Sequence, residues 1–296
     1  MRLLILFLFL AMISPSCKNN PGADQALVQA EKQFNENPTE ENYSALMGKY
    51  LEKIRQSTST QDISGLLVNA VQASRKSNHN DQELLFLNNL VKAYPDRSDK
   101  RENILRLIEL LHKAGKHTTA DELSYAFLKA YPGDSMGEEL KNKLPKGSTP
   151  EDYIAEIGRS IFADTVRGFD EQKAMAYVDA CEAYAMVLNN DEKTPDFLYK
   201  AAETAHTLKT FEKSFALYDW IIDKYPKSPR APIALFMKGF IFDATLHDSA
   251  NAAKFYSEFI AKYPNAEFVK DAKVLMSNLG KSDEEVLKSI REKGGN

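Results

Sequence analysis

The sequence predicts an all-α fold, an α-solenoid of stacked helix–turn–helix repeats that follows an N-terminal signal peptide. After Cys17, apolar residues recur at three- and four-residue spacing, for example in "FALYDWIIDKY" and "IALFMKGFIFDA", and this period is that of an amphipathic helix. We find no alternating apolar run bounded by hairpin turns, so strands are not expected. A Tyr-Pro phrase also recurs, in "LVKAYPDRS", "FLKAYPGDS", "IIDKYPKSPRA" and "FIAKYPNAEFV". Its repetition indicates a repeating structural unit.

The first residues are typical of a signal rather than of the fold. Residues 1–16 contain a single basic residue, Arg2, and an apolar run from Leu3 to Ile13 that is too short to span a bilayer. The segment resembles a bacterial lipoprotein signal, and this resemblance implies that Cys17 is lipidated. Ser14, Pro15 and Ser16 precede Cys17, whereas that signal usually begins these three positions with Leu. Ordinary secretory cleavage, which requires small residues, therefore remains an alternative.

Composition excludes some classes of partner. The chain has 296 residues, of which 43% are hydrophobic, and a formal net charge of −4 with both signs interspersed. A nucleic-acid-binding surface requires a concentrated basic face, so no nucleic-acid partner is expected. The only cysteine besides Cys17 is Cys181; it shares an apolar helical stripe with Val178 and Tyr184, which predicts a buried small side chain.

The residues within each repeat indicate which type of structural unit is repeated. In "LRLIELLHKAGKHTTADELSYAFLKAYP", one helix ends at Lys113, the small residue Ala120 lies where two helices approach, and Tyr131-Pro132 ends the second helix. This pattern resembles the tetratricopeptide repeat, a helix–turn–helix unit with a small residue, an aromatic residue and a closing proline at set offsets. The copy that ends at Pro95 is weaker, because Glu83 stands at the small-residue position.

The predicted organisation has four parts: the signal peptide at 1–16, a helical array at 17–145, a helical junction at 146–194, and a second array with a capping helix at 195–296. The chain resembles tetratricopeptide-repeat lipoproteins of the bacterial envelope, such as those of the outer-membrane β-barrel assembly machine and the Tol–Pal system. The resemblance implies a lipid-anchored scaffold at the outer membrane, facing the periplasm, that binds an envelope protein. A glycan- or ligand-binding lipoprotein of the starch-utilisation type is the alternative.

Motifs that are associated with catalysis or metal binding do not predict an enzyme, a cofactor or a metal. Ser135 lies in "GDSMG", which matches a nucleophile elbow, but that elbow requires a strand-to-helix turn and no strand is predicted here. Glu109 with His112, and Glu203 with His206, have the Glu-x-x-His spacing of di-iron bundles. Those bundles also need a Glu from each of two further helices. We expect both pairs to line a groove instead.

A second aromatic and polar stripe predicts where a partner binds. Leu198, Ala202 and Leu235 already supply apolar contacts on the core side of their helices, so another face remains available. The expected partner groove is lined by residues with helical spacing on two neighbouring first helices: Tyr199, Glu203, His206, Phe236, Phe240 and Asp243. Packing between repeats is the alternative for this stripe.

Overall fold

The computed structural model describes residues 21–145, 147–164, 166, 168–281 and 284–285. The expected signal peptide and Cys17 lie outside these residues. The chain divides into two compact units between Tyr153 and Ile154, within the junction expected at 146–194. No strand occurs in the described part of the chain, so the predicted all-α fold is confirmed.

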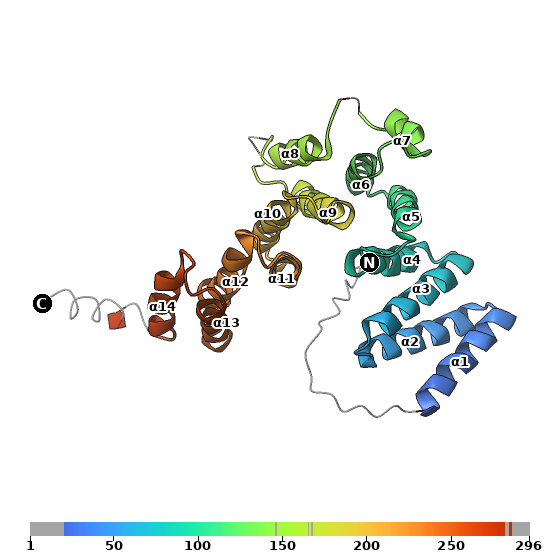
Figure 1. The fold of residues 1–296 in the computed structure, drawn as a ribbon, viewed down its shortest axis with the longest axis horizontal. Coiled ribbons are helices and arrows are strands. Elements are labelled where there is room, and N and C mark those ends of the chain that lie inside the picture. Colours follow the sequence, from blue (N-terminus) through green and yellow to red (C-terminus); the bar gives the residue numbers. More distant parts are fainter. Residues whose placement is uncertain (1–20, 146, 165, 167, 282–283, 286–296) are drawn as a thin grey trace, which may run out of the picture. The chain divides into compact units, whose positions relative to one another are not determined.

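The first unit consists of consecutive helices, each packed on the next (Figure 1). They are α1 (Pro21–Glu36), α2 (Glu40–Gln56), α3 (Thr60–Lys76), α4 (Asn80–Ala93), α5 (Lys100–Lys113), α6 (His117–Ala130) and α7 (Gly137–Lys143). Helix α8 (Pro150–Ser160) contains the division between the units.

The second unit continues the same pattern. Its helices are α9 (Glu171–Val187), α10 (Thr194–Thr207), α11 (Phe211–Lys224), α12 (Arg230–Phe240), the π-helix η1 (Ile241–Thr245), α13 (Ser249–Lys262) and α14 (Val269–Asn278). From α9 to α14 consecutive helices pack on one another, and α10 also contacts α12, which is the first helix of the next pair. Cys181 on α9 is fully buried, as predicted.

The four Tyr-Pro phrases end four helices with one geometry. Each tyrosine is the C-cap residue, and its backbone N–H bonds to the carbonyl oxygen four residues earlier; the residues are Tyr94, Tyr131, Tyr225 and Tyr263. Their φ/ψ values are −126°/63°, −125°/65°, −126°/50° and −130°/61°. A following proline sterically disfavours the helical region at the residue before it, so the helix cannot continue. The repeated phrase is thus a repeated helix stop.

The small-residue position of the repeat is the fourth residue of each second helix. It is fully buried in all four copies, at Glu83, Ala120, Ser214 and Ala252. Three of these side chains are small, as close helix packing requires. The exception is Glu83, the large side chain that the sequence analysis noted at this small-residue position.

Two arginines explain how a carboxylate occupies that buried position. Glu83 Oε1 accepts from Arg75 Nε at 2.7 Å and from Arg106 Nε at 2.8 Å, and Oε2 accepts from Arg106 Nη2 at 2.6 Å. Arg75 lies on α3 of the same helix pair and Arg106 on α5 of the next. Burial alone would raise the pKa of Glu83, but the two guanidinium groups more than offset it and hold that pKa below its usual value. The repeat that ends at Pro95 matches the sequence pattern least well. Glu83 is paired with Arg75 in this repeat and joins it to the next repeat through an ion pair with Arg106.

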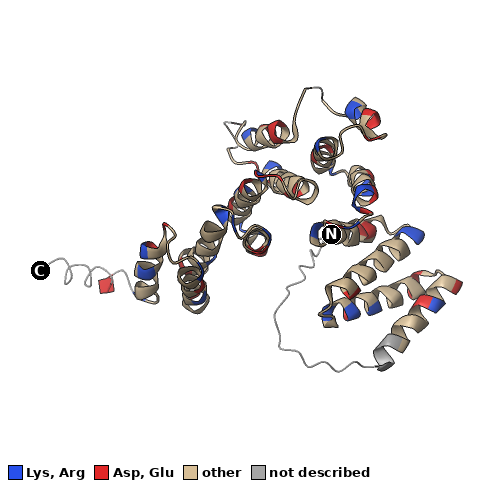
Figure 2. Ribbon diagram, viewed as in Figure 1, with Lys and Arg blue, Asp and Glu red and all other residues tan. Residues whose placement is uncertain are grey.

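In the described residues of each unit, charges of both signs are distributed along the helices. Lys and Arg alternate with Asp and Glu along the helices (Figure 2). Among the described helices, none is both long enough and apolar enough to cross a bilayer.

Candidate partner-binding grooves

The six residues predicted to line a partner groove lie in the second unit, on α10, α12 and η1. Tyr199 on α10 is buried, with 8% of its surface exposed. The Arg230 guanidinium lies over its ring at 4.6 Å from the centroid. Burial raises the pKa of Tyr199 to about 12, and the nearby Glu203 carboxylate contributes in the same direction. Tyr199 is therefore a neutral, packed side chain beside the exposed Glu203.

Phe236 and Phe240 have different environments, although they are one helical turn apart. The Phe236 ring is 5.0 Å from that of Phe268, at the start of α14, and 5.6 Å from that of Phe259 on α13. Only 8% of Phe236 is exposed, against 36% of Phe240. Phe236 therefore takes part in the packing between helices, whereas Phe240 is partly exposed.

The π-helix η1 carries the polar part of this region. Asp243 Oδ2 accepts a hydrogen bond from the Tyr256 hydroxyl at 3.3 Å. The Thr245 hydroxyl lies 3.2 Å from Nε2 of His206, so it joins η1 to α10. The structure thus brings η1 against α10 beside the exposed Glu203. A binding role for the six predicted residues stays a prediction.

The Glu-x-x-His pair of Glu109 and His112 lies in the first unit, and that of Glu203 and His206 lies in the second. Glu109 pairs with Arg106 and Lys113, both on its own helix, at 2.6 Å each. His112 Nδ1 lies 3.2 Å from His117 Nδ1. Within the described ranges, no three His, Cys, Asp or Glu side chains are placed to hold a metal ion.

Ser135 lies in the turn between α6 and α7, as the interhelix interpretation predicts. Its side chain is exposed, and it follows Asp134, which accepts a two-point hydrogen bond from Arg101 at 2.5 and 2.7 Å. This pairing, together with a backbone N–H from Met136, lowers the pKa of Asp134 to about 2. The segment is a helix connection held by an ion pair, not the strand-to-helix turn that a nucleophile elbow requires.

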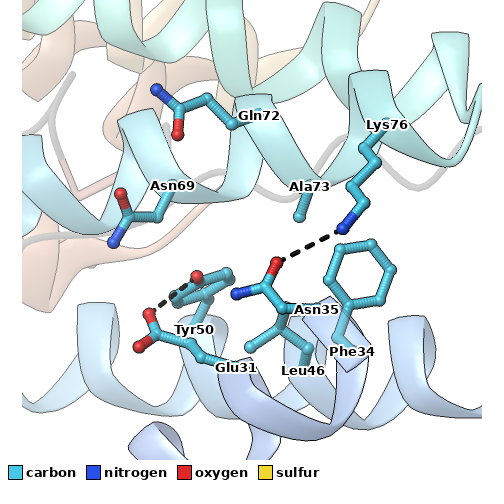
Figure 3. A pocket seen from close by; sticks show the side chains of 9 residues that line it. All are labelled: Glu31, Phe34, Asn35, Leu46, Tyr50, Asn69, Gln72, Ala73 and Lys76. Carbon is cyan, nitrogen blue, oxygen red and sulfur yellow. Dashed lines mark hydrogen bonds between the residues drawn. The ribbon is translucent and has the colours of Figure 1, made fainter. Parts of the chain in front are cut away.

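A cavity that sequence reasoning missed lies in the first unit. It has a volume of about 360 Å³ and is formed by α1 and α3, the first helices of two successive pairs, with α2 between them (Figure 3). We call it the N-terminal groove and define it by its lining residues: Glu31, Phe34, Asn35, Leu46, Tyr50, Asn69, Gln72, Ala73 and Lys76.

The floor and the rim of the N-terminal groove differ in chemistry. Phe34, Leu46 and Tyr50 are buried, with 2%, 1% and 3% of their surfaces exposed. The rim is exposed and polar, with side-chain amides from both α1 and α3: Asn35, Asn69 and Gln72. Asn69 and Gln72 are three residues apart and so share a face of α3. The three-residue spacing of Asn69 and Gln72 was the sequence signal that could have indicated this groove. Polar residues on a helix face are usual at any surface, however, so the signal is weak.

The stacked helix pairs define a repeat protein whose successive first helices form grooves between them. Residues 233–266, which cover most of α12 and all of η1 and α13, match the tetratricopeptide repeat family. No curated protein matches the chain. The match and the all-helical stack support a protein of the tetratricopeptide-repeat class, whose members are generally scaffolds that bind other proteins.

Proposed function

We propose that this protein is a non-enzymatic scaffold of the bacterial cell envelope that is anchored by lipid at Cys17 and binds a protein partner in its grooves. The observation that carries the proposal is the N-terminal groove, a cavity of about 360 Å³ whose rim is polar and whose floor is apolar. Polar side chains that converge on one cavity from α1 and α3 are candidate contacts for a partner. The exposed Phe240 and Glu203 provide a second contact region on the other unit.

The anchor and the location rest on the sequence. Residues 1–16 have the length and apolar content of a secretory signal, and Cys17 follows them directly. Together with the resemblance to envelope lipoproteins, this supports our proposal of a location at the outer membrane, facing the periplasm. The tethered repeats would hold the partner at the membrane surface.

Site-specific photocrosslinking in the native envelope tests partner binding. A photoreactive amino acid is placed at Asn69 in the N-terminal groove and, separately, at Phe240. The control position is Glu138 on α7, whose side chain is 81% exposed but lines neither groove. We expect a discrete protein adduct from Asn69 or Phe240 and none from Glu138. The same adducts at all three positions, or none at either groove position, would contradict the proposal.

A further inference from the structure

We propose that His112 and His117 together bind one zinc ion through their Nδ1 atoms, at the turn between α5 and α6. This site goes beyond the proposed function and involves neither of the grooves described above. His112 lies in the last turn of α5, and His117 is the first residue of α6. A shared metal ion would therefore connect the two helices of one repeat.

A tight turn brings the two imidazoles together. The backbone N–H of Gly115 donates to the carbonyl oxygen of His112 at 3.1 Å, and that of Lys116 donates to the carbonyl oxygen of Leu111 at 2.9 Å. Gly115 has a φ of +73°, which glycine adopts without steric cost at the end of a helix. Helix α6 begins directly after this turn, so its first side chain lies beside the last turn of α5.

The separation of the two Nδ1 atoms fits a single zinc ion. It is 3.2 Å, and the ring centres are 5.5 Å apart. Zinc binds imidazole nitrogen at about 2.0–2.1 Å with tetrahedral angles, which places two nitrogen ligands about 3.3–3.4 Å apart. The two rings therefore need to move very little to share the ion.

Zinc binding at this position requires only a change of tautomer. Without metal, the two Nδ1 atoms form a hydrogen bond in which one neutral ring donates and the other accepts. With metal, each neutral ring carries its single proton on Nε2, and both Nδ1 lone pairs point to the ion. No proton has to leave the pair of rings, because the donor ring only transfers its proton from Nδ1 to Nε2 through solvent.

Asp121 on α6 favours the required tautomer of His112. Its Oδ1 lies 3.9 Å from Nε2 of His112, and its Oδ2 accepts a hydrogen bond from the Tyr153 hydroxyl at 3.3 Å. A carboxylate on that side of the ring attracts the proton to Nε2, as carboxylates do behind histidines that bind metals. Burial raises the pKa of Asp121, and the nearby imidazoles and the Tyr153 hydroxyl oppose this rise. A divalent ion on the other side of the ring would further stabilise the ionised carboxylate.

The site provides two protein ligands and is open to water. The side chain of His112 is 37% exposed, and His117 is exposed. Asp121 approaches the nitrogen of His112 that faces away from the ion, so it is not a third ligand. This agrees with the finding that no three such side chains in the described ranges are placed to hold a metal. Two imidazoles completed by water suit zinc, whereas Mg²⁺ takes oxygen ligands.

Calorimetric titration of the purified full chain with zinc sulfate tests the proposal. Each chain carries Cys17→Ser, so that a thiol at residue 17 cannot bind the metal. We expect one saturable zinc site in this parent chain and no binding of magnesium sulfate. Because a metal that binds only the folded chain stabilises it, zinc should also raise the melting temperature.

Histidine variants show whether the two rings hold the ion. Asp121→Asn should lower the zinc affinity about tenfold, the usual effect of removing a carboxylate behind a ligand. His112→Gln and His117→Gln each remove a ligand, so each should lower the affinity by more than Asp121→Asn does. His247→Asn is the matched control, because His247 is an exposed histidine of the second unit whose φ of 53° asparagine tolerates. Its zinc affinity should equal that of the parent, and circular dichroism verifies the fold of each variant.

Nuclear magnetic resonance of the imidazole nitrogens identifies the ligand atoms. Zinc should shift the Nδ1 resonances of His112 and His117 and leave those of the other three histidines unchanged. Shifts confined to other histidines would overturn the proposal. So would the absence of saturable binding by the parent chain, an unchanged affinity in both ligand variants, or an equal loss in His247→Asn. The hydrogen bond between two neutral rings would then be the whole role of this pair.

Discussion

The ring of Tyr256 on α13 packs directly against the backbone of Gly239 on α12. A Cβ atom at residue 239 would lie 2.7 Å from Tyr256 Cδ1 and 2.8 Å from Cε1, closer than carbon atoms pack. Tyr256 is fully buried and its hydroxyl donates to Asp243, so the ring has little freedom to move. Gly239 therefore sets how closely these two helices approach.

We predict that Gly239→Ala destabilises the second unit by about 1–3 kcal/mol, the usual cost of overpacking. Trp220 on α11 is the single tryptophan of the chain, so its fluorescence during urea unfolding reports this unit. The control is Gly65→Ala on α3, where nothing lies within 4 Å of the added Cβ. That change should stabilise the first unit, followed by circular dichroism because Trp220 lies in the second unit, by about 0.5–1 kcal/mol, since glycine is unfavourable inside a helix. Similar effects of the two substitutions would contradict the packing argument.

The phenol groups of two equivalent cap residues have different partners. The Tyr225 hydroxyl donates to the carbonyl oxygen of Asn189, after α9, at 2.9 Å. The Tyr263 hydroxyl is buried without a hydrogen-bond partner among the described residues. Tyr225→Phe should therefore cost about 1 kcal/mol, whereas Tyr263→Phe should be neutral or stabilising. Paired urea titrations measure both changes, and an equal loss in the two variants would show that the interrepeat hydrogen bond is unimportant.

The buried Glu83 should make the first unit sensitive to acid. Its pKa is lowered in the folded chain, so its contribution to stability is present above the unfolded value of 4.5 and is lost as pH falls through the lower folded value. Glu83→Gln removes the charge between Arg75 and Arg106 and should cost up to about 3 kcal/mol at pH 7. The variant should also lose less further stability below pH 4.5 than the wild type does. Circular dichroism melts across pH 3–7 test this, and parallel pH profiles would refute it.

Substitutions at Phe236 and Phe240 should distinguish a role in packing from a role in binding. Phe236→Ala should cost about 3–5 kcal/mol, because it leaves a cavity among buried rings. Phe240→Ala should cost under about 1 kcal/mol, as partly exposed changes do, yet reduce partner capture. Limited proteolysis and crosslinking yield are measured on both variants. Unfolding of the C-terminal helices by Phe240→Ala would place that side chain in the core.

Cys17→Ser tests the anchor. If Cys17 carries lipid, the substitution abolishes metabolic labelling by a fatty-acid analogue and moves the protein from the membrane to the soluble fraction. Cys181→Ser is the matched control: Cys181 is fully buried, so labelling and fractionation should match the wild type. Unchanged labelling of the Cys17 variant would contradict lipidation at Cys17, and absence of labelling in the wild type would favour ordinary secretion.

The sequence by itself determined the helices, their ends and the contact positions of the repeat. Helical periodicity and the steric effect of a proline on the preceding residue act over a few residues, so they can be read locally. This is why Ala120 and the helix end at Tyr131-Pro132, whose motif recurs three more times, were predicted correctly from their spacing.

Only the tertiary structure decided which side chains are covered, since that depends on helices distant in the sequence. Phe236 and Phe240 have the same type and helical spacing, yet Phe268 covers only the former. Glu83 is tolerated in the core because Arg106 reaches it from the next pair. The N-terminal groove depends in the same way on α1 and α3 being held on either side of α2. Burial and cavities arise from packing between segments, and no local pattern specifies them.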